Sequence, residues 1–201
     1  MTIEVLQVDE ITAGSPVSLT APATADCLVL CQHNNESSAA ALSAASWNAV
    51  ALSLVASEVI FFDASSVWIL PAPDHGTYNL AWTGNKDTLW AVWLRGVRQV
   101  SPVRAAATAN VPGSNNTISV TVGSSEGDLV LYLLSSNSGD APTASGLTEL
   151  DQSVAPFGAI GYEAGASPSV AGGWGFPSDQ HMTEIAVSLI PAPQGAVMWF
   201  F

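Results

Sequence analysis

Histidines and close pairs of carboxylates are the residues of this sequence that could carry out acid–base chemistry. His33, His75 and His181 lie in well-separated segments, each beside polar or turn-forming residues. A metal-binding histidine usually has a second ligand at helical or hairpin spacing, and these three histidines lack one. We therefore predict that they are surface or turn histidines.

Two pairs of carboxylates could serve a glycosidase, which needs two acids flanking the scissile bond. Glu126 with Asp128, and Glu149 with Asp151, would each lie on one face of a strand, about 7 Å apart. Both pairs fall in turn-like segments, where solvated carboxylates are the usual state. The sequence also lacks the Gly-x-Ser-x-Gly motif of a nucleophilic serine. It therefore predicts a protein that is not an enzyme and has no catalytic residue.

Oxygen-bearing side chains that could bind calcium cluster in residues 34–36, 85–87 and 137–140. None of these segments has the spacing of an EF-hand, so calcium stays an alternative to the expectation of no cofactor and no metal ligand. Cys27 and Cys31 lie in a strand-like segment. Four residues of a strand span about 13 Å, beyond the Cα separation of about 7 Å that a disulfide allows. We expect two free thiols.

The composition excludes several classes of protein. The chain has 201 residues, 4 lysines and arginines against 17 aspartates and glutamates, a net charge of −13 and a hydrophobic content of 48%. This composition excludes a disordered chain, and the lack of basic residues excludes nucleic acid and an anionic membrane as partners. No apolar run is long enough for a spanning helix, and residues 1–5 lack the basic start of a signal peptide. We expect synthesis and assembly in a cytoplasm, without export by a signal peptide.

Short apolar runs predict an all-β fold, because Gly, Pro, Asn or Ser interrupts them every eight to twelve residues. Residues 88–94 and 129–134 are apolar on both faces, which is typical of strands in the middle of a covered sheet. Residues 77–83 and 117–122 alternate, so they predict half-exposed strands. Only the alanine-rich segment 37–46 is a helix candidate. The pattern indicates two packed antiparallel sheets with little or no helix.

Aromatic residues divide into a predicted core set and a predicted contact set. Trp68, Trp82, Trp90 and Trp93 lie in strand patterns and are expected in the core. Residues 158–177 are rich in Gly, Pro and Ser and predict a long loop. Trp174 and Phe176 of this loop contact a ligand or partner, or else fold down as a lid over the sandwich. The expected partner contacts are Val197, Met198, Trp199, Phe200, Phe201, Trp174 and Phe176.

The chain is predicted to have one principal domain. Residues 1–25 form an N-terminal strand segment that packs on the sandwich or on a partner, and residues 26–192 form the sandwich. Residues 193–201 are a linker followed by an apolar tail. Because a free apolar tail would aggregate, we expect burial of this tail in its own fold or in a neighbouring subunit.

Several segments resemble a β-sandwich module that recurs in tailed-phage virion proteins and in some bacterial surface proteins. These segments are residues 47–57, 67–84, 96–104, 127–130 and 185–192, and the resemblance extends over about residues 26–192. It implies a jelly-roll or lectin-like sandwich with a structural or adhesive role and no catalysis. Because the shared positions are sheet and turn positions, they carry more information about fold than about role.

The resemblance leads to an expected function as a capsid decoration or cement protein on the outer head surface of a tailed phage. Expected partners are the major capsid protein, other virion subunits and further copies of the chain, as a homo-oligomer such as a trimer. The expected location is the virion, after synthesis in the host cytoplasm. One alternative is a carbohydrate-binding or host-adhesion module that binds a surface glycan through Trp174, Tyr162 and nearby loops. The other is a tail or baseplate component.

Overall fold

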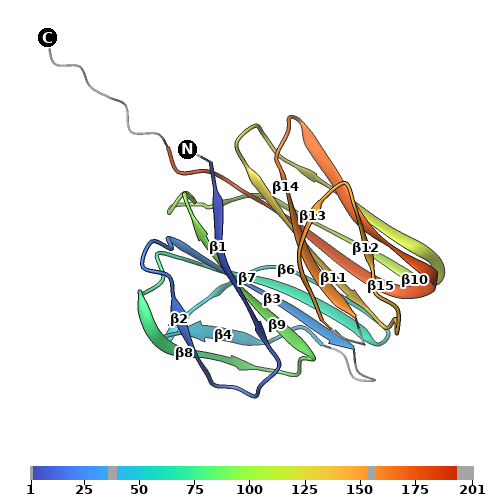
Figure 1. Ribbon diagram of the computed structural model, residues 1–201, viewed down its shortest axis with the longest axis horizontal. Helices are drawn as coiled ribbons and strands as arrows, with labels where there is room; N and C mark the ends of the chain where they lie inside the picture. Colours follow the sequence, from blue (N-terminus) through green and yellow to red (C-terminus); the bar gives the residue numbers. More distant parts are fainter. Residues whose placement is uncertain (1, 36–39, 154–156, 194–201) are drawn as a thin grey trace, which may run out of the picture.

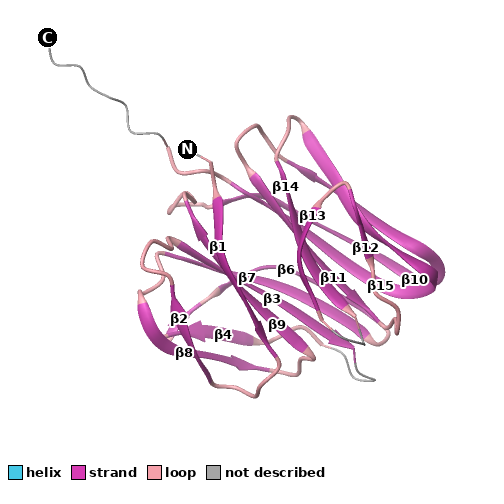
Figure 2. Ribbon diagram, viewed as in Figure 1, coloured by secondary structure: helices cyan, strands magenta, loops and turns pink. Residues whose placement is uncertain are grey.

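The computed structural model describes residues 2–35, 40–153 and 157–193. These residues contain no helix and lie mainly in strands (Figure 1; Figure 2). The strands are β1 (Glu4–Ile11), β2 (Val17–Ala21), β3 (Cys27–Asn35), β4 (Ala44–Trp47), β5 (Val50–Ala51), β6 (Ser53–Ile60), β7 (Asp63–Pro71), β8 (Gly76–Thr83), β9 (Thr88–Arg95), β10 (Val103–Gly123), β11 (Leu129–Ser136), β12 (Thr143–Ser145), β13 (Thr148–Gln152), β14 (Gly158–Ala164) and β15 (Ser169–Leu189). None of the described residues belongs to a helix that could cross a membrane.

The strands form three antiparallel sheets. The N-terminal inner sheet has the order β1-β9-β3-β7-β6, and the N-terminal outer sheet has the order β2-β8-β4-β5. The third sheet has the order β10-β15-β11-β14-β13, with β12 paired to β15. The all-β antiparallel sandwich predicted from the sequence is confirmed, with three sheets in place of two.

The third sheet supplies two layers because its two longest strands each contribute to both. β10 and β15 pair along their whole length, with register shifts near Pro112 and Asn115. Residues 103–111 and 182–189 complete the C-terminal inner layer with β11, β14 and β13. Residues 117–123 of β10 pair with residues 169–175 of β15, and β12 pairs with the same part of β15. These three segments form a C-terminal outer layer. Because Val120 and Val122 pack on Val130 and Tyr132 of β11, the long hairpin folds back over its own inner layer.

Each half of the chain has the strand order of a jelly roll. The N-terminal half has eight strands when β5 and β6 are counted as one strand that passes from the outer to the inner sheet. Counted in this way, the first, eighth, third and sixth strands are neighbours in the inner sheet, and the second, seventh and fourth strands are neighbours in the outer sheet. The C-terminal half repeats this order when each of β10 and β15 counts as two strands. The protein is therefore a tandem pair of eight-stranded jelly rolls.

The sequence carries the same duplication. Val17-Ser18-Leu19-Thr20-Ala21 of β2 matches Ile118-Ser119-Val120-Thr121-Val122 of β10, and Asp26-Cys27-Leu28-Val29 matches Asp128-Leu129-Val130-Leu131. Strand pairing follows the same register, because Val17 and Trp47 pair with Leu80, as Ile118 and Ala144 pair with Trp174. Leu80 and Trp174 therefore hold equivalent positions.

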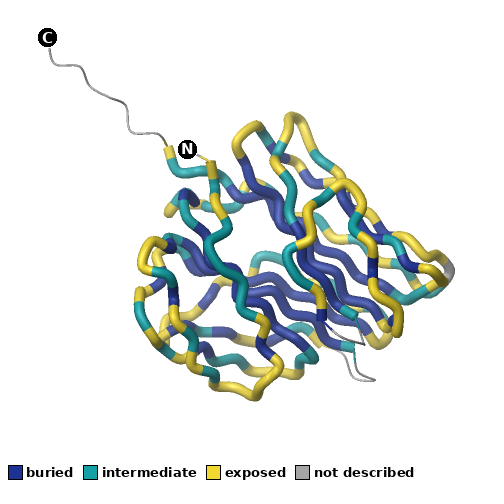
Figure 3. The backbone as a smooth tube through the Cα atoms, in the orientation of Figure 1, coloured by how far each residue is buried: buried dark blue, intermediate teal, exposed yellow. Residues whose placement is uncertain are grey.

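The two jelly rolls pack through their inner sheets. Cys27, Val29 and Cys31 of β3 share one core with Leu129 and Leu131 of β11, which hold the equivalent positions. Each half therefore uses the same face of its inner sheet for this contact. Separate cores fill the space between each inner sheet and its outer layer. Buried residues are concentrated in the two inner sheets, and exposed residues lie mostly on the outer layers (Figure 3).

Several strand predictions are confirmed. β9 lies between β1 and β3, β11 lies between β15 and β14, and both are buried on both faces, as their continuous apolar sequences predict. In β8, Thr77 and Asn79 are exposed whereas Leu80 is buried, as the alternating pattern predicts.

Other expectations differ from the structure. The predicted loop over residues 158–177 is wrong, because β14 and the outer part of β15 occupy most of it. Glycine-rich sequence forms a strand here because neighbouring strands approach its backbone closely. Of the helix candidate 37–46, residues 44–46 lie in β4. The N-terminal segment contributes β1 to the inner sheet and β2 to the outer sheet.

Candidate functional site

Trp174 and Phe176 are core residues. Trp174 lies in β15 between Ile118 of β10 and Ala144 of β12, and it is 1% exposed. Phe176 is also buried and packs in the same core. Tyr162 packs instead on the core between the two inner sheets. The structure therefore does not bring Trp174 and Tyr162 together as one sugar site. The tail contacts predicted at residues 197–201 lie outside the described residues.

Polar side chains gather at one end of the interface between the inner sheets. Nδ1 of His33 lies 2.7 Å from Oγ of Ser135, and the hydroxyl groups of Ser65 and Thr183 share a hydrogen bond. All four residues are fully buried. The prediction that His33 is a surface or turn residue is wrong, because the end of β3 is covered on both faces. His33 and Ser135 hold equivalent positions in the two jelly rolls and are in contact with each other.

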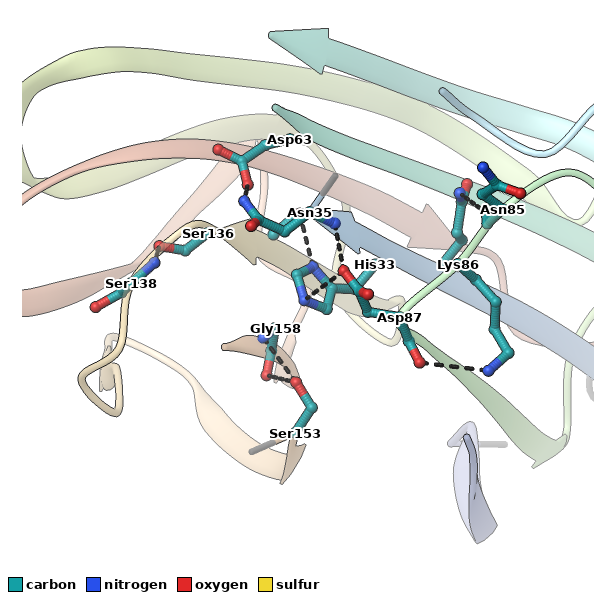
Figure 4. Close-up of polar contacts among 12 residues, drawn as sticks. His33, Asn35, Asp63, Asn85, Lys86, Asp87, Ser136, Ser138, Ser153 and Gly158 are labelled. Carbon is teal, nitrogen blue, oxygen red and sulfur yellow. Dashed lines mark hydrogen bonds and ion pairs between the residues drawn. The ribbon is translucent and has the colours of Figure 1, made fainter. Parts of the chain in front are cut away.

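Asp87 reaches this polar cluster from the turn before β9 (Figure 4). Its Oδ2 accepts a hydrogen bond from the backbone N–H of Asn35 at 2.5 Å and lies 4.0 Å from Nε2 of His33. Nδ2 of Asn35 donates to Oδ1 of Asp63 at 2.7 Å. The fold thus brings Asn35, from the oxygen-rich segment 34–36, next to Asp87 of the segment 85–87, while Glu36 lies outside the described residues. The described residues contain no group of three or more His, Cys, Asp or Glu that could hold a metal ion.

Two buried carboxyl groups have strongly raised pKa values. Burial raises the pKa of Asp63 to about 7, the charge of Asp87 adds to the shift, and the hydrogen bond from Asn35 opposes it. Burial raises the pKa of Glu184, on the other face of the C-terminal inner layer, to about 9. Among the described residues, Oδ2 of Asp63 and both carboxyl oxygens of Glu184 have no hydrogen-bond partner. In the folded protein Glu184 is therefore mainly protonated at pH 7, whereas Asp63 is about half protonated at that pH.

The carboxylate pairs differ from the solvated loop acids that the sequence predicts. The carboxylate of Asp128 is buried and accepts hydrogen bonds from Arg104, Ser125 and Ser188. Oδ2 of Asp151 accepts a hydrogen bond from Nε1 of Trp90 at 3.0 Å. For Asp128 the prediction of a solvated carboxylate is wrong, because the chain packs an arginine and a sheet strand against it.

The remaining candidate residues are the two cysteines, His75 and His181. Cys27 and Cys31 are buried free thiols, as predicted, and burial raises the pKa of Cys31 to about 12, which keeps it protonated. His75 is an exposed turn residue whose Nε2 lies 2.6 Å from the carbonyl oxygen of Ala25. His181 lies in β15 and contacts the ring of Phe61 edge to face.

The N-terminal groove is a depression on the exposed face of the N-terminal outer sheet. Its volume is about 530 Å³. Ser18 of β2 and Asn79 of β8 are cross-strand neighbours, and the backbone N–H of Asn48 donates to the carbonyl of Asn79. Nδ2 of Asn48 donates to Oδ2 of Asp74 at 2.7 Å, which holds the amide in place. The polar and aromatic side chains of the lining are Ser18, Ser46, Asn48, Thr77, Tyr78 and Asn79.

The C-terminal groove is a depression of about 470 Å³ on the C-terminal outer layer. Its floor is the glycine-rich part of β15, and its walls are the hydroxyl-bearing residues of β10 and β12. One row across the three strands is Thr117, Gly175 and Thr143, and the next is Ser119, Gly173 and Ser145.

The two grooves occupy equivalent positions in the two jelly rolls. Alignment by strand register superposes Ser18, Asn79 and Asn48 on Ser119, Gly173 and Ser145. All nine residues that line the N-terminal groove have an equivalent in the lining of the C-terminal groove. The rims correspond as well, since Ala49 and Gly146 hold equivalent positions and both have a positive φ, 64° and 77°. The candidate site is therefore a pair of grooves.

Sequence reasoning missed these grooves because each assembles residues that are about 30 to 60 positions apart. The signal that could have found them is the internal repeat of Val17–Ala21 at residues 118–122. Once the repeat is known, the exposed positions of one outer sheet identify those of the other.

The floor of the C-terminal groove depends on Gly173. A Cβ atom at Gly173 would lie 2.1 Å from the carbonyl oxygen of Ile118, whereas a Cβ atom at Gly175 would have its nearest contact at 3.7 Å. We expect Gly173→Ala to lower the free energy of unfolding by about 3 kcal/mol, because backbone would have to move, and Gly175→Ala to change it by less than about 1 kcal/mol. Denaturant unfolding of the two variants measures the difference. Equal stability of the two variants would contradict the described strand spacing.

The fold and these grooves define a tandem jelly-roll protein with two surface depressions. Comparison of the chain with protein-family models, curated proteins and solved structures gives no match. The function is therefore argued from the residues.

Proposed function

We propose that this chain is a non-enzymatic structural protein of a tailed-phage particle, a decoration protein on the outer surface of the capsid. The sequence resemblance described above supports a role as a component of a tailed-phage particle. The observation that supports the mode of action is an apolar edge of the N-terminal jelly roll. Attachment through this edge requires no catalytic residue. It requires the burial of apolar surface and the pairing of the edge strand with a strand of the partner.

The apolar edge consists of β5, edge strand β6 and the turn to β7. Its exposed large side chains are Val50, Leu54, Val59, Phe61 and Phe62, which are 48% to 66% exposed. An exposed hydrophobic edge strand is a template for pairing with another chain. The edge therefore supports attachment to a shell subunit or to a second copy of the protein.

The equivalent edge of the other jelly roll has a different character. There β13 carries Glu149 and Asp151, and Leu150 is its only large apolar residue. Since the same fold position is acidic in one half and apolar in the other, the jelly-roll fold does not require an apolar edge. This asymmetry supports a contact role for β6, and the net charge of −13 would keep free copies soluble before assembly.

The location is tested by immunogold electron microscopy of particles from the source of the sequence. Gold spread evenly over the heads is the expected result. Gold at the tail tip would replace decoration with a tail or baseplate role, and unlabelled particles would overturn the proposal.

Substitution at the apolar edge tests the mode of attachment. We expect the double variant Leu54→Asp, Phe62→Asp to lower co-sedimentation with particles at least tenfold, because each charge would have to be desolvated in the contact. Folding should be retained, since both side chains are 48% exposed. Val100→Asp is the matched control, because Val100 is 78% exposed and lies outside the edge. Equal loss in the control, or no loss in the double variant, would exclude the edge as the contact.

A further inference from the structure

We propose that the two grooves are equivalent binding sites for a neutral saccharide, so that one chain binds a polysaccharide at two points. This inference does not depend on a location in a virion. It rests on the chemistry of the linings, on their equivalence and on their positions in the molecule.

The linings select for an uncharged ligand. Neither groove is lined by a Lys, Arg, His, Asp or Glu residue of the described chain. The net charge of −13 disfavours an anion, and the linings offer no carboxylate to bind a cation. The hydroxyl groups of serine and threonine and the side-chain amide of asparagine can each donate and accept hydrogen bonds. A ligand with many hydroxyl groups and no charge fits this combination.

The polar groups of the N-terminal groove form a line across the sheet. Ser18 lies in β2, Asn79 in β8 and Asn48 in the turn that follows β4, and neighbouring strands lie about 4.8 Å apart. The line therefore extends for roughly 10 Å, the scale of two linked sugar rings. Tyr78 is a lining residue whose half-buried ring packs against Trp47 in the core beneath this sheet. Because the amide of Asn48 is held by Asp74, part of this surface is ordered before a ligand binds.

The C-terminal groove repeats this arrangement with a more open floor. Hydroxyl groups of Ser119 and Ser145 flank Gly173, where the N-terminal groove has Asn79. Trp174 belongs to the same strand, but its side chain is 1% exposed and packs in the core beneath the floor with Ile118 and Phe176. The polar groups that face the groove are therefore the hydroxyl groups of its walls and the backbone of its floor.

The positions of the grooves favour a polymer over a single sugar. The outer layers lie at opposite ends of the stack of four β layers (Figure 1). Three spacings of about 10 Å between layers separate the grooves by about 30 Å. A shallow neutral groove binds a sugar weakly, with a dissociation constant on the order of 1 mM. Simultaneous engagement of both grooves by one polymer, or by neighbouring chains on a surface, raises the overall affinity without any new contact.

The test is a titration of the ¹⁵N-labelled full chain with maltohexaose, cellohexaose and chitohexaose, followed by backbone amide shifts. The expected result is that at least one hexasaccharide shifts amides in both grooves, namely in residues 17–18, 46–49, 77–81, 117–119, 143–146 and 171–175. The proposal would be overturned if none of the three shifts these amides at about 10 mM, or if only one groove responds.

Single-groove variants test equivalence and independence. Asn79→Ala should weaken binding at the N-terminal groove about tenfold and leave the C-terminal groove unchanged, and Ser145→Ala should do the reverse. Gln152→Ala, on the exposed edge strand β13, is the matched control and should change neither groove. Simultaneous loss at both grooves in either single variant would overturn independent sites. Equally strong binding of alginate, an anionic polysaccharide, would overturn the neutral class of ligand.

Discussion

Replacement of Glu184 by leucine is expected to stabilise the protein by about 3 kcal/mol at pH 8. Glu184 is fully buried, and neither of its carboxyl oxygens has a hydrogen-bond partner among the described residues. Its strand neighbours are Leu134 of β11 and Ala109 of β10, so the carboxyl group lies among apolar side chains. The equivalent position in the N-terminal jelly roll holds Leu89, which is also fully buried. The fold therefore accepts leucine at this place.

The pH dependence of stability follows from the raised pKa of Glu184. Its folded pKa is about 9 and its ordinary value is 4.5, so the folded protein holds a proton that the unfolded chain has released between these values. The stability that the folded protein gains by keeping Glu184 protonated is fully present below about pH 4.5. It is lost as the pH rises towards 9, by about 1.4 kcal/mol per pH unit. Asp63, with a folded pKa of about 7, adds to the loss only up to pH 7.

Urea unfolding at pH 7.5, 8 and 8.5 isolates the contribution of Glu184, because Asp63 is then largely ionised in both states. The wild-type chain should lose stability steeply across these values, and Glu184→Leu should remove most of that slope. Glu149→Leu, at an exposed position of β13, is the matched control and should keep the wild-type slope. If the slope survives in Glu184→Leu, another group is responsible for it. At pH 8 the melting temperature of Glu184→Leu should rise by about 6 to 12 °C.

Replacement of Asp128 by alanine should destabilise the protein by about 3 kcal/mol at pH 7. The Asp128 side chain has no exposed surface. Its Oδ2 accepts hydrogen bonds from Nε of Arg104 at 2.5 Å, the backbone N–H of Ser125 at 3.0 Å and Oγ of Ser188 at 2.9 Å. Nη2 of Arg104 also donates to Oδ1 at 3.1 Å. Alanine would leave these donors without their acceptor and break the link between β10, the turn before β11 and β15.

The pH dependence of this contribution has the opposite sign to that of Glu184. Hydrogen bonds and the charge of Arg104 lower the pKa of Asp128, although burial opposes the shift. Its stabilisation is therefore present above the ordinary pKa of 3.8 and is lost as the pH falls through the lowered folded value. Protonation of Asp128 therefore destabilises the protein at acidic pH, whereas Glu184 and Asp63 destabilise it as the pH rises above their ordinary pKa values.

Denaturant unfolding at pH 5 and at pH 2 tests the role of Asp128. The difference between wild type and Asp128→Ala should be large at pH 5 and smaller at pH 2. Glu4→Ala is the control, because it removes the exposed ion pair with Arg95 and should have a much smaller effect. A difference that is equal at both pH values would mean that packing, rather than the charge of Asp128, accounts for the loss.

Local sequence patterns were sufficient for the fold class and for the position of several strands within their sheets. The alternation of residues 77–83 predicts one exposed and one buried face, and the continuous apolar run of residues 88–94 predicts a strand covered on both sides. The spacing of Cys27 and Cys31 excludes a disulfide. These inferences hold because side-chain direction in a strand is fixed by the backbone itself, with a period of two residues.

The sequence carries the duplication only weakly, since its two copies share sheet positions more than a contiguous motif. The repeat at residues 17–21 and 118–122 would have predicted two jelly rolls and equivalent outer sheets. The glycine-rich segment that contains Trp174 was interpreted as a loop, because glycine weakens a strand when neighbours are unknown. A side chain at Gly173 would clash with the backbone of β10, and a side chain at Gly172 would clash with the ring of Tyr132 in β11.

The sequence by itself determined an acidic all-β protein with free thiols and a tryptophan-rich core, because composition and local periodicity act through the chain's own backbone. Only the tertiary structure decided that Trp174 is buried, that Glu184 is a carboxyl group among apolar side chains, and that two neutral grooves face outwards. Each of these depends on the folding of the β10–β15 hairpin over its own inner layer, or on the register between distant strands. Contacts of this kind join residues far apart in sequence, and no local pattern specifies them.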